Sequence, residues 1–187
     1  ELAQDLGVRT IQLAGYDVYY EEKSSQTRQR FIKNLRKACD WAEEAQVVLA
    51  IEIMDDPFIN SIEKYLAVEK EIDSPYLFVY PDIGNVSAWH NDVYSEFYLG
   101  HHAIAALHLK DTYAVTESSK GQFRDVTFGQ GCVKWEEAFD ILKQTNYNGP
   151  FLIEMWSENC ETVEETRAAI QEAQAFLYPL IKKAGLM

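Results

Sequence analysis

The chain has 187 residues, 47% of them hydrophobic and 13% aromatic, and it carries a net charge of −13 at pH 7. This length can bury one sizeable core, so we expect residues 1–187 to belong to a single domain. A strongly acidic chain is a poor partner for nucleic acid or anionic membranes, because both are bound through clustered Lys and Arg. The three Cys lack CxxC spacing and no apolar run is long enough for a membrane helix, which predicts a reducing, cytoplasmic location.

The first half of the chain alternates between strand and helix patterns. Residues 1–7 resemble the last turns of an amphipathic helix ending at a glycine, so we expect sequence upstream of them. A β-branched strand over 8–15 is followed by a helix over 26–45. The apolar spacing predicts that one face of this helix buries Phe31, Leu35, Ala38 and Ala42.

Two more units follow in the same order. A strand over 47–55 leads into a helix that we expect to begin with a capping box, in which Asn60 is the cap and Glu63 its partner. That helix carries Ile62, Leu66 and Ile72 on its apolar face. A third strand covers 77–82 and precedes a short helix around 91–100.

The last two units complete a series of five. A strand over 104–110 is followed by a long polar loop and a helix over 134–144. The fifth strand covers 151–156, and Thr162 with Glu165 forms a capping box that opens the final helix. Five strand-helix units in series predict a parallel sheet with right-handed crossovers.

Four of these strands end on a residue that can bind a divalent cation. The residues are Glu52, Asp82, His108 and Glu154. Active sites of α/β barrels gather at the C-terminal ends of the strands, and no GxGxxG or GxxxxGK[ST] turn supports a doubly wound nucleotide-binding sheet. A shell of three carboxylates and one imidazole favours Mn²⁺ or Mg²⁺, with Zn²⁺ or Co²⁺ as alternatives. Asp55 and Asp56 could compete as ligands, but their place beside a proline favours a loop role.

A closed barrel needs eight strands and about 250 residues, whereas this pattern provides five strands. The sequence therefore predicts an N-terminally truncated piece of a TIM (β/α)8 barrel.

The chain contains, in this order, the motifs VRTIQLAGYDVYY, LAIEIMDDP, VYPDIGNVSAWHND, LHLKDT, FGQG and GPFLIEMWSE. In these motifs it resembles the L-ribulose-5-phosphate 3-epimerases of bacterial ascorbate and pentose catabolism, also called L-xylulose-5-phosphate 3-epimerases. The resemblance covers essentially the whole chain. It implies a barrel of the xylose isomerase-like kind, in which the present strands are the fourth to the eighth. It also implies that the four strand-end residues hold a metal ion and that the two glutamates transfer protons.

Such chemistry follows from the residues as well. Epimerising a carbon beside a ketose carbonyl requires removing a C–H proton and returning one to the opposite face. Glu52 and Glu154 are expected at separate points of the barrel mouth, so one could act as the base and the other as the acid. A divalent cation would stabilise the cis-enediolate as its negative charge develops.

The substrate, a sugar phosphate, needs further polar partners. Barrels often bind phosphate at the loops after their last two strands, where the candidates are Lys120, Arg124 and the N–H groups at Gly129 and Gly131. An equally good reading is that the two cations only make a long loop soluble. Lys110 shares the strand phase of His108 and is expected to point inward, and Asn85 could donate to a sugar hydroxyl.

Two alternatives stay open at this point. An aldose-ketose isomerase of hexulose 6-phosphate could use the same four ligands with a single base. A catalytically incomplete barrel fragment could keep the ligands yet lack pocket walls, and its open strand edges would favour self-association. We expect a homodimer.

Overall fold

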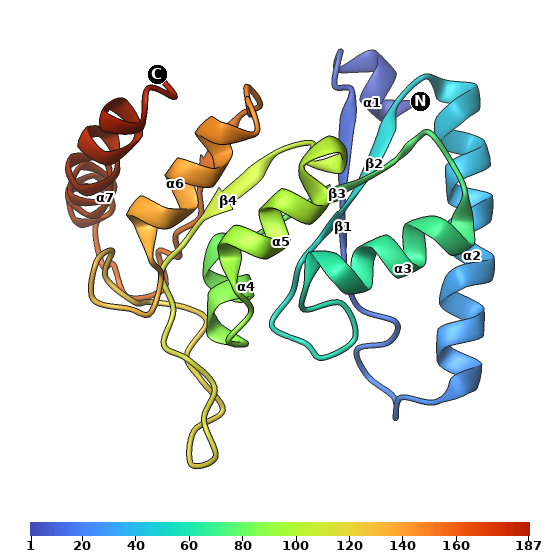
Figure 1. The fold of residues 1–187 in the computed structure, drawn as a ribbon, viewed down its shortest axis with the longest axis horizontal. Coiled ribbons are helices and arrows are strands. Elements are labelled where there is room, and N and C mark those ends of the chain that lie inside the picture. Colours follow the sequence, from blue (N-terminus) through green and yellow to red (C-terminus); the bar gives the residue numbers. More distant parts are fainter.

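The computed structural model describes residues 1–187 and shows the alternation of strands and helices that the sequence predicts (Figure 1). The helices are α1 (Leu2–Asp5), α2 (Ser25–Ala45), α3 (Ile62–Ile72), α4 (Ile83–Ala88), α5 (Val93–Gly100), α6 (Trp135–Gln144) and α7 (Val163–Ala184), with a short 3-10 turn at His101–Ala103. The strands are β1 (Thr10–Ala14), β2 (Val48–Glu52), β3 (Leu77–Tyr80), β4 (Leu107–Leu109) and β5 (Phe151–Ile153).

All strand pairings are parallel and follow chain order. The strands β1, β2 and β3 form one sheet and β4 pairs with β5. Two isolated parallel bridges, Val79 to Ile104 and Asp82 to His108, connect β3 to the β4 segment. The predicted row of five parallel strands is therefore confirmed, and it places the four strand-end residues on one side of the molecule.

The helices cover the outer side of this row of strands (Figure 1). Between the two layers lies one continuous core of 30 buried apolar or aromatic residues, which includes Ile51, Leu107, Phe97 and Phe139. Burial of this aliphatic and aromatic surface is the main stabilising contribution to the fold. It also fixes the strand ends from which the polar side chains project.

The helix starts follow their capping residues. Thr162 and Glu165 form the expected box at α7, since the Thr162 hydroxyl accepts from the Glu165 N–H and the Glu165 carboxylate accepts from the Thr162 N–H. The predicted box at Asn60 and Glu63 is wrong. Ser61 caps α3 instead, and Glu96 of the neighbouring helix α5 accepts the N–H groups of Ile62 and Glu63. A tertiary contact replaces the local one.

Two further details differ from the sequence-based expectation. The buried face of α2 contains Ile32 and Cys39 beside the expected Leu35 and Ala42, whereas the expected Phe31 and Ala38 are only partly buried against the core. Helix α4 was not predicted. It has only six residues, which is too short to show an apolar period.

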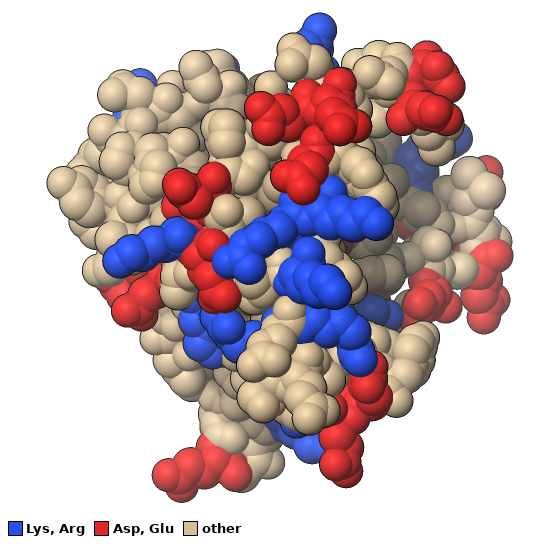
Figure 2. Space-filling model, turned by 90° about the vertical axis from the view of Figure 1, so that its right-hand side faces the viewer, with Lys and Arg blue, Asp and Glu red and all other residues tan.

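Basic residues gather on the face formed by α2 and its neighbours, where Figure 2 shows a band of Lys and Arg between acidic groups. Much of this charge is paired on the surface. Arg28 and Arg36 both contact Glu71, and Arg30 contacts Glu21. None of the helices combines the length and the hydrophobicity needed to cross a bilayer.

Candidate active site

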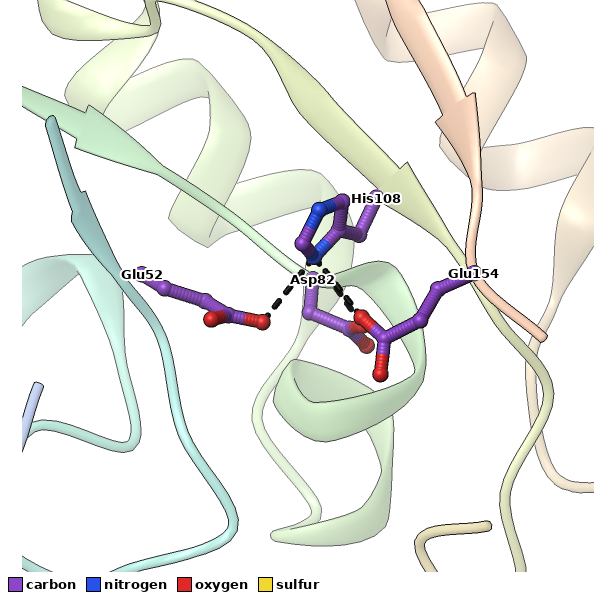
Figure 3. A group of neighbouring side chains, drawn as sticks. All are labelled: Glu52, Asp82, His108 and Glu154. Atoms are coloured by element: carbon purple, nitrogen blue, oxygen red, sulfur yellow. Dashed lines mark hydrogen bonds and ion pairs between the residues drawn. The ribbon is translucent and has the colours of Figure 1, made fainter. Parts of the chain in front are cut away.

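Four side chains from four consecutive strand ends converge on one point (Figure 3). Glu52 ends β2, His108 is the central residue of β4, and Glu154 directly follows β5. Asp82 lies two residues after β3 and caps α4, where its Oδ1 atom accepts the Asn85 N–H at 2.7 Å. One potential ligand atom from each of the four side chains lies within 4.8 Å of the other three.

The distances within this cluster fit a shared cation. The Nδ1 atom of His108 lies 2.9 Å from Oε1 of Glu52 and 2.8 Å from Oε2 of Glu154, with Oδ2 of Asp82 at 3.9 Å. A ring nitrogen carries at most one proton, so it can satisfy only one of these oxygens. The buried atoms Asp82 Oδ2 and Glu154 Oε2 have no close polar partner apart from His108 and Lys110. Three carboxylates and one imidazole that face one another in this way suit a divalent cation.

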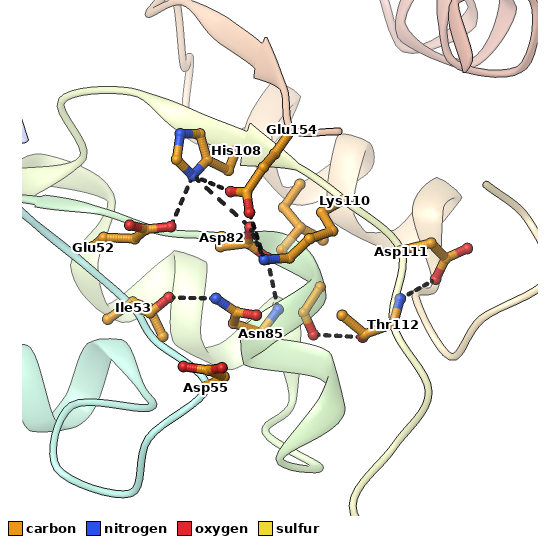
Figure 4. Close-up of polar contacts among 12 residues, drawn as sticks. Glu52, Ile53, Asp55, Asp82, Asn85, His108, Lys110, Asp111, Thr112 and Glu154 are labelled. Carbon is orange, nitrogen blue, oxygen red and sulfur yellow. Dashed lines mark hydrogen bonds and ion pairs between the residues drawn. The ribbon is translucent and has the colours of Figure 1, made fainter. Parts of the chain in front are cut away.

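Lys110 completes the electrostatics of the cluster (Figure 4). Its ammonium group lies 2.9 Å from Oε1 of Glu154 and 3.2 Å from Oδ2 of Asp82, and only 7% of the residue is exposed. The side chain points inward, as its phase on the strand predicts. It offsets part of the negative charge that the buried carboxylates of Glu52 and Asp82 and the half-buried Glu154 would otherwise concentrate.

Burial and neighbouring charges shift the pKa values of Asp82, His108 and Glu154, and the two effects often oppose each other. Burial raises the pKa of Asp82 to about 7. Burial lowers the pKa of His108, but hydrogen bonds and charge from Glu154 and Glu52 outweigh it and raise the pKa to about 9. For Glu154 burial alone would raise the pKa, yet His108 and Lys110 together hold it below its ordinary value. At neutral pH the metal-free cluster therefore carries a protonated imidazole.

These pKa shifts predict the pH dependence of metal binding. A metal ligand must be a neutral imidazole, so binding displaces the proton that His108 holds below about pH 9. We expect affinity to rise roughly tenfold per pH unit between pH 7 and 9, and to level off above that. Below pH 7 the metal affinity should depend on pH more steeply, because Asp82 must also lose a proton before it can bind the ion. Titration calorimetry in buffers of different ionisation enthalpy would measure the protons released, and a pH-independent affinity would contradict the assignment of His108 as a ligand.

A cavity of about 230 Å³ opens onto the cluster. Asn85 lines it, but its Nδ2 group already donates to the Ile53 carbonyl at 2.9 Å, and its Oδ1 atom is buried without a partner. Asn85 therefore presents an acceptor, where the sequence suggested a donor. Tyr16 and Asp55 line the same cavity and are hydrogen bonded to each other, and Asp55 lies outside the four-residue cluster.

The predicted phosphate cradle at Gly129 and Gly131 is wrong, because the protein fills it with its own carboxylate. Oδ2 of Asp111 accepts the N–H groups of Gly129 at 2.8 Å and Gly131 at 3.1 Å. Asp111 is 1% exposed. A side-chain carbon at Gly131 would lie 2.0 Å from Oδ1 of Asp111, which shows how closely the loop wraps this group. These N–H groups are not free to bind phosphate.

The two basic candidates of the same loop differ. Arg124 lines the 230 Å³ cavity and its guanidinium lies 4.1 Å from the ring centre of Trp156. Lys120 is exposed and lines neither of the cavities near the cluster. The second of these cavities, about 580 Å³, lies beyond Glu154 and Lys110 and has a mainly apolar wall that includes Phe128 and Phe176.

Comparison with known proteins places this site in a family. The family of xylose isomerase-like TIM barrels matches residues 1–180. The chain belongs to this family. A solved structure of an L-ribulose 3-epimerase superposes on 98% of the chain and 64% of its own length, with a TM-score of 0.77 and 19% identity. At this identity the superposition establishes the barrel fold and nothing about the reaction.

Two curated relatives match the whole chain. The L-ribulose-5-phosphate 3-epimerase UlaE of Escherichia coli O157:H7 is 46% identical, and the match covers 63% of its length. SgbU of Haemophilus influenzae, by name a candidate L-ribulose-5-phosphate 3-epimerase, is 51% identical over 64% of its length. The chain thus spans less than two thirds of the relatives it matches. The resemblance deduced from the motifs is confirmed.

Proposed function

We propose that the protein takes part in the metal-dependent 3-epimerisation of a ketopentose 5-phosphate, interconverting L-ribulose 5-phosphate and L-xylulose 5-phosphate. The observation that carries this proposal is the placement of two glutamates from β2 and β5 on either side of His108 (Figure 3). The names of the relatives, which match the full chain at 46% and 51% identity, support the substrate class.

The residues have separate roles in this proposal. One of Glu52 and Glu154 accepts the C3 proton from one face of the sugar, and the other delivers a proton to the opposite face. Lys110 keeps a positive charge beside Glu154 and Asp82 while the substrate becomes anionic. Asn85 offers its free Oδ1 atom to a hydroxyl group of the substrate.

The metal would be held by Glu52, Asp82, His108 and Glu154. When bound, a divalent cation supplies the positive charge that stabilises an enediolate. Oxygen-rich ligand sets suit Mn²⁺ and Mg²⁺ better than Zn²⁺, which prefers nitrogen and sulfur. We therefore favour Mn²⁺ or Mg²⁺.

For the phosphate group we propose Arg124, because it lines the cavity that holds the ligand cluster and stacks on Trp156. A guanidinium can bind phosphate through two parallel hydrogen bonds. We also propose that the protein is a homodimer and that it is cytoplasmic. Its three free cysteines support a reducing compartment.

Hydrogen exchange at C3 tests the proposed reaction. In D₂O with Mn²⁺, the protein is expected to introduce deuterium at C3 of L-ribulose 5-phosphate and to form L-xylulose 5-phosphate, both of which NMR can follow. Deuterium at C1, with an aldose as product, would instead identify an aldose-ketose isomerase. Absence of exchange in protein that demonstrably holds metal would overturn the proposal.

A further inference from the structure

Each of the two glutamates in the cluster uses its two carboxylate oxygens differently. One oxygen faces the His108 ring nitrogen, namely Oε1 of Glu52 at 2.9 Å and Oε2 of Glu154 at 2.8 Å. The other oxygen is turned away and held by a donor. Gln12 donates to Oε2 of Glu52 at 2.6 Å, and Lys110 donates to Oε1 of Glu154 at 2.9 Å. We call these turned-away atoms the outer oxygens.

Both donors reach the outer oxygens because of strand register. In the β1–β2 pair, Gln12 lies opposite Ala50, and Ala14 lies opposite Glu52. Side chains two residues apart on a strand share one face, so Gln12 and Glu52 project to the same side of the sheet. Lys110 stands two residues after His108 and shares its side in the same way. Gln12 and Lys110 both line the 230 Å³ cavity.

Neither donor is explained by packing. Gln12 lies in the middle of β1 opposite Ala50, and Lys110 directly follows β4, but neither side chain belongs to the apolar core. Hydrogen bonds to a carboxylate are strong because the acceptor is charged, and the 2.6 Å contact of Gln12 is short. Groups that hold the non-binding side of a metal ligand fix its orientation and often change affinity 10- to 100-fold.

We propose that Gln12 and Lys110 are positioning residues that hold the outer oxygens, so that Glu52 and Glu154 each present one oxygen to a metal ion. This inference rests on the proposed metal centre. It assigns the two residues a shared task that neither the fold nor the epimerase reaction requires by itself. With its outer oxygen free, a glutamate could rotate or bind the ion through both oxygens, and the arrangement around His108 would change.

Replacement of each donor by methionine tests the proposal, because methionine keeps the chain length and removes the N–H group. We expect Gln12→Met to weaken Mn²⁺ binding about 10- to 100-fold in titration calorimetry of the full chain. Gln144→Met is the matched control, since Gln144 is exposed on α6 and its amide contacts only the exposed side chains of Asp140 and Tyr94, away from the cluster. The control should bind as the wild type does.

A double-mutant cycle separates positioning from a general structural effect. If Gln12 acts through Glu52, then Gln12→Met should change affinity less than about twofold in a Glu52→Ala background. Circular dichroism would confirm that each variant is folded. An unchanged affinity in Gln12→Met, or an equal loss with Glu52 absent, would overturn the role of Gln12.

For Lys110 the electron paramagnetic resonance spectrum of bound Mn²⁺ is the sharper measurement, because removing a nearby cation alters affinity as well as geometry. Lys110→Met is expected to change the spectrum, whereas Lys110→Arg, which keeps a charged donor, and the exposed control Lys183→Met should preserve it. An unchanged Lys110→Met spectrum would overturn the role of Lys110. Wild-type protein that binds no Mn²⁺ would instead overturn the proposed metal centre itself.

Discussion

Replacing Asp111 with alanine is expected to lower the free energy of unfolding by roughly 3–5 kcal/mol, the largest loss we expect from a single change outside the apolar core. The carboxylate is buried and serves as the common acceptor for the loop that follows β4. Its donors are the backbone N–H groups of Thr112, Gly129, Gly131 and Val133 and the indole N–H of Trp135. Alanine would leave the buried donors of Thr112, Val133 and Trp135 without a partner and would release the partly buried N–H groups of Gly129 and Gly131. Urea unfolding followed by circular dichroism would measure the loss.

Two further variants make this result interpretable. Asp140→Ala removes an exposed carboxylate from α6 and should change stability by less than about 0.5 kcal/mol. Asp111→Asn keeps the size and one acceptor oxygen, so it should lose less than alanine and provide folded protein if alanine does not. In that variant, amide hydrogens of Gly129 and Gly131 should exchange faster with solvent. Stability of Asp111→Ala equal to that of Asp140→Ala would show that the carboxylate does not anchor the loop.

The role of Asp111 also shows where sequence reasoning stops. The glycines at 129 and 131 do surround an anion, as their pattern suggests, but the anion is a side chain 18 and 20 residues earlier. Nothing in the local sequence distinguishes an internal carboxylate from a bound phosphate. Gln12 is a similar case, because its partner Glu52 lies 40 residues away and only strand register brings them together.

The strand-end residues could be predicted because each stands at a break in an apolar run. Glu52, Asp82, His108 and Glu154 lie within or just after four strands whose pairing order is fixed by the series of strand-helix units. Parallel strands in sequence order must bring these ends to one side, so the cluster follows from local patterns plus one topological rule. The start of α3 could not be predicted in the same way, since Glu96 from another helix decides it.

Replacing either Glu52 or Glu154 with glutamine is expected to reduce the rate of epimerisation by about 10²- to 10⁴-fold. This is the usual contribution of a general acid or base. The two variants should differ in a specific way. In the proposed mechanism each glutamate faces one side of the substrate, so each would remove the C3 proton from only one of the two epimers. A variant that retains one glutamate should still exchange C3 hydrogen of the epimer facing it, without inverting that carbon. The other epimer should not exchange.

Measuring C3 deuterium incorporation by NMR, from L-ribulose 5-phosphate and from L-xylulose 5-phosphate separately, would reveal this pattern. Metal content must be determined in parallel, because both glutamates also belong to the ligand cluster. Glu158→Gln changes an exposed carboxylate beyond β5 and is the matched control. Complementary losses in the two variants would identify two bases on opposite faces. Loss of exchange for both epimers in one variant, with full exchange in the other, would identify a single base and contradict the two-glutamate mechanism.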